Sequence, residues 1–204
     1  MSVFRGIFGP SKQHLIAQMR SGDNRAALQA VEKLKAIGWF RDGSLVGINL
    51  TRANLQGAAL ARANLERAVL AAANLAKAYL GETILRQADL QDAVLADANL
   101  REVVLSGARL MRADLRRAYL AVSDLSAADL SEARLQGANL WQTRLYRANL
   151  SRANLVGAAF YDARFDDQTI LPDGSRWTPE IDLARFTDPQ HPEFWSVDRL
   201  NGHH

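Results

Sequence analysis

The sequence of 204 residues predicts an all-β solenoid, a chain that winds into a four-sided coil. Leucine occupies every fifth position from Leu45 to Leu155 without a break, and two positions before it stands a small residue, usually alanine. On a helix five residues advance about 500°, so successive leucines would be offset by roughly 140° and form no apolar stripe. On a strand the small residue and the leucine share one face. Because five is odd, the chain must turn a corner within every repeat.

The exceptions to alanine indicate the number of sides. Between residues 53 and 163 the small position departs from alanine only at Thr83, Val103, Ser123 and Thr143, which are 20 residues apart. Twenty residues are four repeats, so these side chains would stack in one column of a square coil. Adjacent strands lie about 4.8 Å apart, which predicts about six coils and a length of roughly 29 Å. The expected interior includes Leu55, Leu75, Leu100, Leu120, Leu140, Phe160 and Phe165.

The repeats carry a recognisable motif. The runs Ala53-Asn54-Leu55, Ala88-Asp89-Leu90 and Ala148-Asn149-Leu150 resemble the A(D/N)LXX motif of the pentapeptide-repeat family, and the resemblance covers about residues 44–167. It implies that family's right-handed quadrilateral parallel β-helix, with the central leucine and the small residue both pointing inward. Phe160 and Phe165 replace leucine in the last two repeats, a substitution that the family tolerates.

The flanking segments are expected to be different modules. Residues 1–43 predict an N-terminal helical cap, with helices over 12–19 and 24–37 and Asp23 as the N-cap of the second. Residues 168–204 predict a short C-terminal cap and tail, with a helix from Thr178, its N-cap, through Phe186. Open ends of a coil would expose unpaired strand edges, which is why caps are expected. A homodimer through an end cap is a further expectation.

Aromatic residues of the C-terminal segment have two interpretations. Trp177, Phe186, Phe194 and Trp195 either cover the last coil or line an aromatic ligand pocket, and the need to cap a solenoid favours the first.

Residues for catalysis are not apparent. The chain has no cysteine, and His14, His191, His203 and His204 all lie outside the repeats and in no recognisable nucleophile motif. Glycines recur at the corner positions and form no phosphate-binding loop. We therefore expect no enzyme, no cofactor and no metal site. The N-terminus lacks the layout of a signal peptide and no stretch is long enough for a membrane span, so a cytoplasmic location without a membrane partner is expected.

Charge is distributed unevenly. The net charge is +3, but residues 45–165 carry fifteen Lys and Arg against eleven Asp and Glu, whereas residues 166–204 carry three against eight. Outward columns such as Asp89, Arg109 and Asp129 alternate in sign and predict self-neutralising ladders. Arginine and aromatic residues late in the shaft suggest a partner surface, or aromatic stacking without a partner. The candidate residues are Arg116, Arg117, Tyr119, Arg134, Trp141 and Tyr161.

The predicted function is a non-catalytic interaction or scaffold module that presents a rigid β-helical surface to an unidentified protein partner. The family resemblance also implies a DNA mimic that binds DNA gyrase or topoisomerase, but such a mimic needs an acidic surface, and this shaft is basic without an insertion for a projecting loop. A weak nucleic-acid binder is favoured by a pI of about 9.5. It is disfavoured by the interleaved acids and by the lack of a stacking motif or groove-reading helix.

Overall fold

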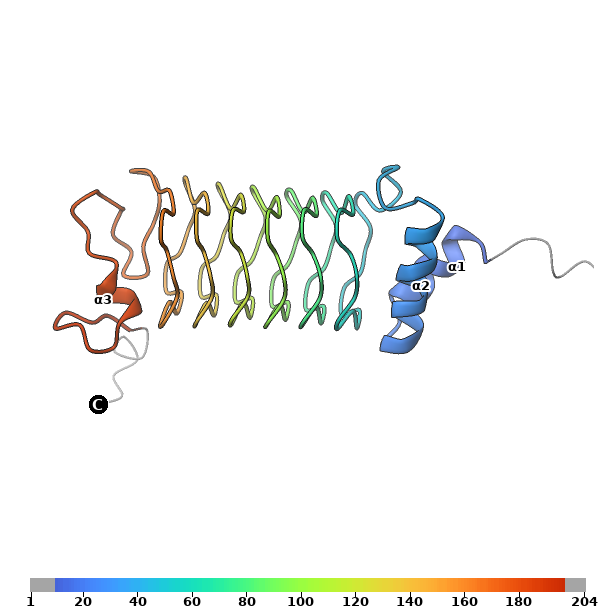
Figure 1. Cartoon of the computed structure of the whole chain (residues 1–204), viewed down its shortest axis with the longest axis horizontal. Helices are drawn as coiled ribbons and strands as arrows, with labels where there is room; N and C mark the ends of the chain where they lie inside the picture. The colour runs from blue at the N-terminus through green and yellow to red at the C-terminus, as the bar shows by residue number, and fades with distance from the viewer. Residues whose placement is uncertain (1–9, 197–204) are drawn as a thin grey trace, which may run out of the picture.

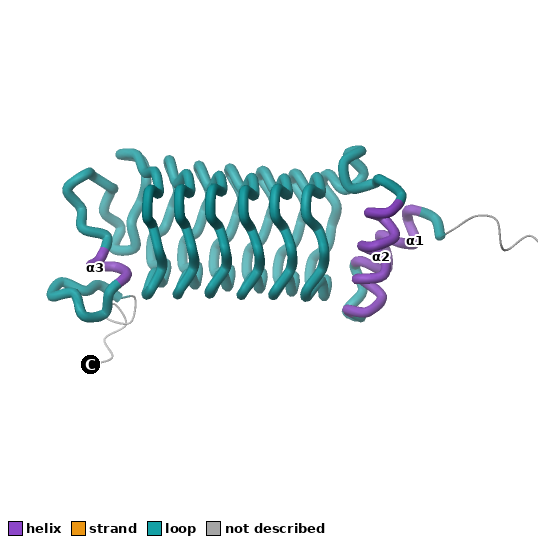
Figure 2. Tube along the Cα trace, in the orientation of Figure 1, coloured by secondary structure: helices purple, strands orange, loops and turns teal. Residues whose placement is uncertain are grey.

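The chain is elongated, with helices at one end, a coil in the middle and an irregular segment at the other end (Figure 1). The computed structural model describes residues 10–196. Helix α1 spans Lys12–Met19, α2 spans Asn24–Ala36 and α3 spans Ala184–Thr187. The coil lies between α2 and α3, and Figure 2 draws it without strands because each of its strands is a single bridging residue.

The coil has four sides. Parallel bridges join residues 20 apart in sequence, from Asn49 with Val69 to Arg144 with Arg164. Two hydrogen bonds flank each bridge: at Asn99, for example, its own N–H donates to the carbonyl of Ala78 at 2.9 Å, and the Leu100 N–H donates to that of Tyr119 at 2.8 Å. Every repeat is thus bonded to the coil before it and the coil after it, as the 20-residue column spacing predicts.

Every corner uses a left-handed backbone conformation. The carbonyl of each central leucine accepts the N–H three residues on, as from Ala118 to Leu115 at 3.0 Å, and the second residue between them has a positive φ. Glycine suits this conformation, but most corners hold other residues, with φ from 53° at Gln142 to 63° at Arg62. Such a residue costs about 1–2 kcal/mol, and the hydrogen-bonded coils on both sides hold it there.

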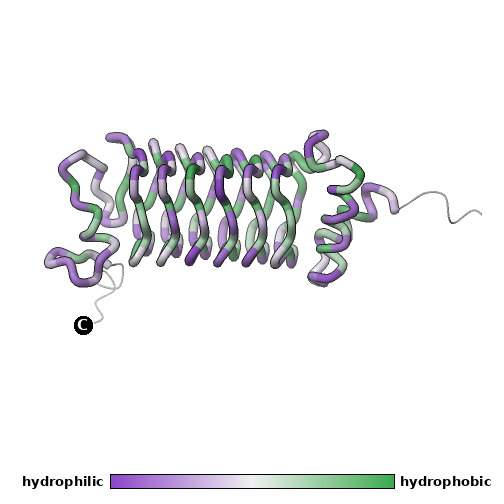
Figure 3. The backbone as a smooth tube through the Cα atoms, in the orientation of Figure 1, coloured by the Kyte–Doolittle hydropathy of each residue, from purple (hydrophilic) through white to green (hydrophobic). Residues whose placement is uncertain are grey.

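The interior is a column of leucine and small residues. Leu55, Leu75, Leu100, Leu120 and Leu140 are fully buried, whereas Phe160 and Phe165, near the C-terminal end of the coil, are only partly buried. Hydrophobic and hydrophilic residues alternate along each turn of the coil, as Figure 3 shows. This alternation places the leucines inside and the charged side chains outside.

One inward column is polar. Thr83, Ser123 and Thr143 are fully buried, and their hydroxyls donate to the main-chain carbonyls of leucines in the preceding coil at 2.8–2.9 Å. Val103 fills the same column without a hydroxyl. A buried hydroxyl is tolerated when it is hydrogen-bonded, which is why serine and threonine can stand in an otherwise apolar column.

The bridge ladder continues beyond residue 167, where the sequence register ends, by means of one extra residue. Asn149 pairs with Ile170, 21 residues on, and the Leu150 N–H donates to the Ile170 carbonyl at 2.8 Å. Thr169 takes the small inward position and donates its hydroxyl to the carbonyl of Leu145 at 2.9 Å. Leu171 then fills the central position and is fully buried.

The N-terminal helices pack against the beginning of the coil. Ser11 and Asp23 are the N-caps of α1 and α2. The Arg20 Nε donates to the carbonyl of Asn49 at 2.6 Å, and the Asn24 side chain donates to that of Asn54 at 3.2 Å. Apolar residues of α2 are buried against the same end: Ala27, Ala30, Val31 and Leu34.

The C-terminal segment is less helical than predicted. The helix expected from Thr178 through Phe186 is wrong, since only Ala184–Thr187 is helical. The Asp182 carboxylate accepts the N–H of Ala184 at 2.9 Å, and such local bonding competes with helix formation.

The aromatic residues of this segment pack against the coil and one another. Trp177 stacks on Phe165 with ring centroids 5.6 Å apart, and Phe186, which is buried, meets Trp195 edge-on at 6.0 Å. Phe194 is half-buried. The cavity beside Phe186 and Trp195 measures about 10 Å³, room for a water molecule and not for an organic ligand.

Candidate protein-interaction surface

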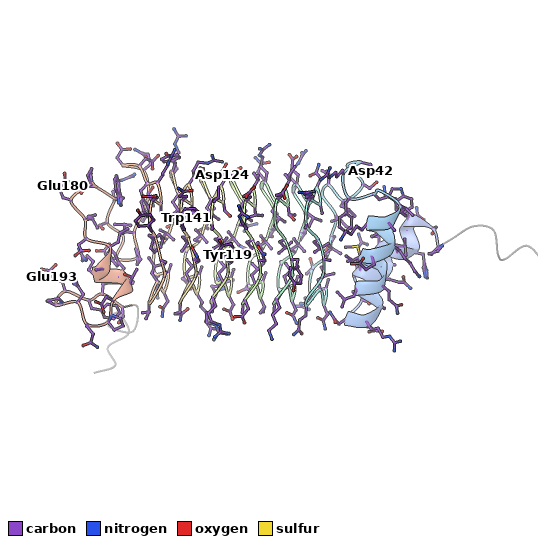
Figure 4. All side chains as sticks on the ribbon, in the orientation of Figure 1. Asp42, Tyr119, Asp124, Trp141, Glu180 and Glu193 are labelled. Carbon is purple, nitrogen blue, oxygen red and sulfur yellow. The ribbon has the colours of Figure 1, made fainter. Side chains whose placement is uncertain are left out.

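Four exposed hydrophobic residues gather late in the shaft, and we call them the aromatic corner: Tyr119, Val122, Trp141 and Tyr161. Trp141 and Tyr161 occupy the first position of the same corner in successive coils, and the Gln142 N–H donates to the Tyr161 carbonyl at 2.9 Å. Tyr119 lies on the face before this corner (Figure 4), so the three aromatic residues do not share one flat side. The surface bends around an edge of the coil.

The main chain at Trp141 is fixed by hydrogen bonds. Its backbone N–H donates to the Asn139 side chain at 2.9 Å, and its backbone carbonyl accepts the Val122 N–H at 2.8 Å. Ala121, directly before Trp141 in the column, is fully buried although it stands at a corner. Trp141 itself stays 39% exposed.

Val122 is strained. Its φ is 62°, a conformation in which a β-branched residue is an outlier. The residue is also 38% exposed, so burial of its side chain offsets little of the strain energy. Backbone strain that is not needed for packing tends to persist at functional sites, which draws attention to this corner.

The predicted arginines are all in ion pairs. Arg117 makes two hydrogen bonds to Asp97 at 2.7 and 2.9 Å, which lower the pKa of that carboxyl. Arg116 makes two to Asp114 at 2.8 and 2.6 Å. Partial burial raises the pKa of Asp114, but the bonds from Arg116 outweigh it and the pKa is lowered. Arg134 stands 3.9 Å from the same carboxylate.

The structure therefore separates the two halves of the predicted surface. Arg116 and Arg117 form the corner on the far edge of the Tyr119 face, and Arg134 lies on the face beyond that corner. Their side chains are exposed but already satisfied by carboxylates. The Tyr119 face therefore separates Arg116 and Arg117 from the corner that Trp141 and Tyr161 occupy.

Two other arginines flank the aromatic corner on its opposite side. Arg144 and Arg164 are bridged on the next face of the coil, with Arg144 3.5 Å from Asp124. Arg164 makes no ion pair within residues 10–196. Both line a hollow of about 190 Å³ together with Val122 and Gln142. The 20-residue column spacing could have placed Arg144 and Arg164 side by side from the sequence. It could not show which of the two lacks a carboxylate partner.

Several other charges of the shaft neutralise one another between coils, as the columns predict. Arg112 bonds to Asp92 at 2.7 Å, Arg62 bonds to Glu82 at 2.9 Å and Arg109 lies 3.6 Å from Asp89. Each pair spans neighbouring coils and is exposed, so it contributes about 0–1 kcal/mol.

The described residues contain no group of three or more His, Asp or Glu side chains able to hold a metal ion. The described helices are all too short or too polar to cross a bilayer. His191 lies 3.4 Å from the Asp182 carboxylate in the C-terminal segment, and His14 is on α1. His203 and His204 lie outside the described residues.

Comparisons with solved structures give resemblances to repeat proteins. HetL, a pentapeptide repeat protein involved in heterocyst differentiation regulation in the cyanobacterium Nostoc, is 32% identical, with 63% of this chain and 74% of that chain covered and a TM-score of 0.38. A pentapeptide repeat protein of the Arabidopsis thaliana thylakoid lumen is 26% identical, with 59% and 73% covered and a TM-score of 0.39. QnrB1, a plasmid-mediated fluoroquinolone resistance protein, is 17% identical, with 62% and 69% covered and a TM-score of 0.35.

No curated protein matches the sequence. The family model of pentapeptide repeats matches in eight copies over residues 48–87, 88–126 and 128–167, which together are more than half of the chain. The motif, the unbroken register and this match agree, and the chain belongs to the pentapeptide-repeat family.

Proposed function

We propose that this protein is a non-catalytic interaction module that binds a protein partner through the aromatic corner. The observation that carries the proposal is the exposure of Trp141, Tyr161 and Tyr119, at 39%, 71% and 38%, beside the strained Val122. Large aromatic side chains of this kind are the usual anchors of protein interfaces. Single exposed hydrophobic residues are common on monomers, but a contiguous group of them marks an interaction site.

The coil suits such a role because it is rigid before binding. Every repeat is hydrogen-bonded on both sides, so the aromatic corner needs little ordering when a partner docks, and little entropy is lost. Arg164 adds a cation without a carboxylate partner among the described residues, next to the hydrophobic corner. A partner with an apolar patch and an adjoining acidic group would be complementary.

The charge pairing favours this role over the two alternatives. A DNA mimic that binds gyrase or topoisomerase needs carboxylates free to replace phosphates, yet most acidic residues of the shaft pair with arginine. A nucleic-acid binder needs free cations, and most shaft arginines are neutralised by the same pairs. Glu180 and Glu193 lie apart from each other in the C-terminal segment (Figure 4) and make no ion pair within residues 10–196, so the gyrase alternative would depend on that acidic segment and not on the shaft.

The segments before and after the repeats are proposed to be end caps of a right-handed coil of about six turns. The bonds from Arg20 and Asn24 to the first coils support this at one end. Stacking of Trp177 on Phe165 supports it at the other end. We propose a cytoplasmic location for the protein and its partner.

Tyr161→Ala tests the proposed surface, because this side chain is the most exposed of the aromatic corner. The purified variant and wild type are immobilised and exposed to a lysate of the native host. Tyr79→Ala is the matched control, since Tyr79 is also exposed, at 60%, but stands four coils away along the shaft. We expect one protein to be retained by wild type and Tyr79→Ala and lost from Tyr161→Ala.

Equal retention by all three would contradict the proposal. Retention of a gyrase subunit that neither substitution weakens would favour the DNA-mimic alternative.

A further inference from the structure

A notch interrupts another corner of the coil, one face away from the aromatic corner. At this corner two successive coils carry only small residues, while the coils on either side carry long ones. The resulting hollow measures about 580 Å³. Its floor and ends, which we call the corner notch, are formed by Ser106, Gly107, Ser126, Ala127, Arg86 and Arg147.

The floor of the corner notch offers unused hydrogen-bond donors. Where an Asn or Asp stands two residues before the corner, the first corner N–H donates to its side chain, as Ser126 does to Asp124 at 3.0 Å. Val104 precedes Ser106 and provides no such acceptor, so within residues 10–196 the Ser106 N–H makes no hydrogen bond. The hydroxyls of Ser106 and Ser126 are likewise free to donate to a ligand in the hollow.

The two ends of the corner notch are positively charged. Arg86 and Arg147 make no ion pair within the described part of the chain, in contrast to Arg62 and Arg112 at the two neighbouring corners. The one carboxylate that lines the hollow is Asp166. Its Oδ1 already accepts the N–H of Arg147 at 2.8 Å and the hydroxyl of Thr169 at 2.9 Å, so it closes the coil and leaves the Arg147 guanidinium uncompensated.

The spacing of these charges selects an extended chain. Arg86 and Arg147 stand three coils apart, which is about 14 Å at the usual strand spacing. Four residues of an extended peptide also span about 14 Å, and residues i and i+4 point to the same side. Small floor residues leave room for the backbone between the two charges.

We propose that the corner notch binds an extended acidic peptide segment whose carboxylates, four residues apart, pair with Arg86 and Arg147. The serine hydroxyls and the Ser106 N–H bond to the main chain of the peptide between them. This site is separate from the aromatic corner, so the test of peptide binding is independent of the test of the function proposed above.

The probe is a fluorescein-labelled peptide of nine residues. Two of them are glutamates, at positions i and i+4, and the others are serine and threonine. Binding is followed by fluorescence anisotropy at low ionic strength. Two control peptides carry the glutamates at i and i+3, on opposite sides of the chain, or lysines at i and i+4. We expect saturable binding of the first peptide, weaker binding of the second and none of the third.

Matched variants locate the binding. Arg86→Gln and Arg147→Gln should each weaken binding about threefold, in the range of one exposed ion pair. Ala127→Gln should fill the hollow and weaken it at least as much, and the corner accepts this side chain because Gln87 and Gln142 have the same conformation. Arg152→Gln, which removes an exposed charge from a different corner, should bind as wild type.

The proposal is overturned if the i+4 and i+3 peptides bind equally, or if Arg152→Gln weakens binding as much as Arg147→Gln. Either result would mean a non-specific charge effect. Absence of saturable binding to the first peptide would overturn it as well.

Discussion

Truncation of one central leucine measures how strongly the interior column holds the coil. Leu100 is fully buried, and its coil is fixed by bonds from the Leu100 N–H to Tyr119 at 2.8 Å and from the Leu80 N–H to Asn99 at 2.7 Å. Removing most of a buried leucine costs 2–5 kcal/mol, more when the surroundings cannot collapse. Because both neighbouring coils are pinned by hydrogen bonds, we expect Leu100→Ala to lose about 3–5 kcal/mol.

Urea unfolding followed by circular dichroism measures this change. Arg101→Ala is the control at the next residue, since its side chain is 58% exposed and its partner Glu102 is also at the surface. Its cost should stay within about 0.5 kcal/mol. A loss below about 1 kcal/mol for Leu100→Ala, or equal losses for the two variants, would refute the assignment of inward and outward positions.

Three further predictions concern corners, the polar column and acid. Gln142→Val should destabilise by about 1 kcal/mol because φ is 53° there, whereas Gln142→Gly should change stability by less; equal thermal melts would argue against strain. Thr143→Val should stay within about 1 kcal/mol in urea unfolding, since Leu120 still accepts the Ser123 N–H; a much larger loss would show that the hydroxyl anchors the coil. Hydrogen bonds from arginine lower the pKa of Glu82, Asp92 and Asp97, so their contribution is complete above about pH 5 and is lost as the pH falls through the folded-state pKa values. Melting temperatures should therefore be flat from about pH 7 to 5 and fall below about pH 4, and a rise there would contradict the pairing.

The sequence predicts the coil well because the repeat is strict. Leucines at a period of five require a corner in every repeat, and the spacing of Thr83, Val103, Ser123 and Thr143 gives four sides, which the bridges between residues 20 apart confirm. Backbone hydrogen bonding then follows from the register alone.

The remaining features depend on choices that the register does not determine. The extra residue before Thr169 has no periodic signal, and the helix from Thr178 fails because Asp182 bonds locally instead. Arg116 could have pointed to a carboxylate of another coil, yet it bonds to Asp114 of its own repeat. The column spacing could indicate the pairs of Arg117 with Asp97 and of Arg134 with Asp114, which are 20 residues apart, but it could not indicate the pair of Arg116 with Asp114.

The most direct test of the proposed interaction surface is site-specific photo-crosslinking in the native host. A photoreactive phenylalanine analogue is introduced at Tyr161 in one variant and at Tyr79 in another, two exposed tyrosines of the same shaft. If the aromatic corner receives a partner, one protein should be cross-linked from position 161 and none from position 79. The same cross-links from both positions, or none from position 161, would contradict the claim that the aromatic corner receives a partner.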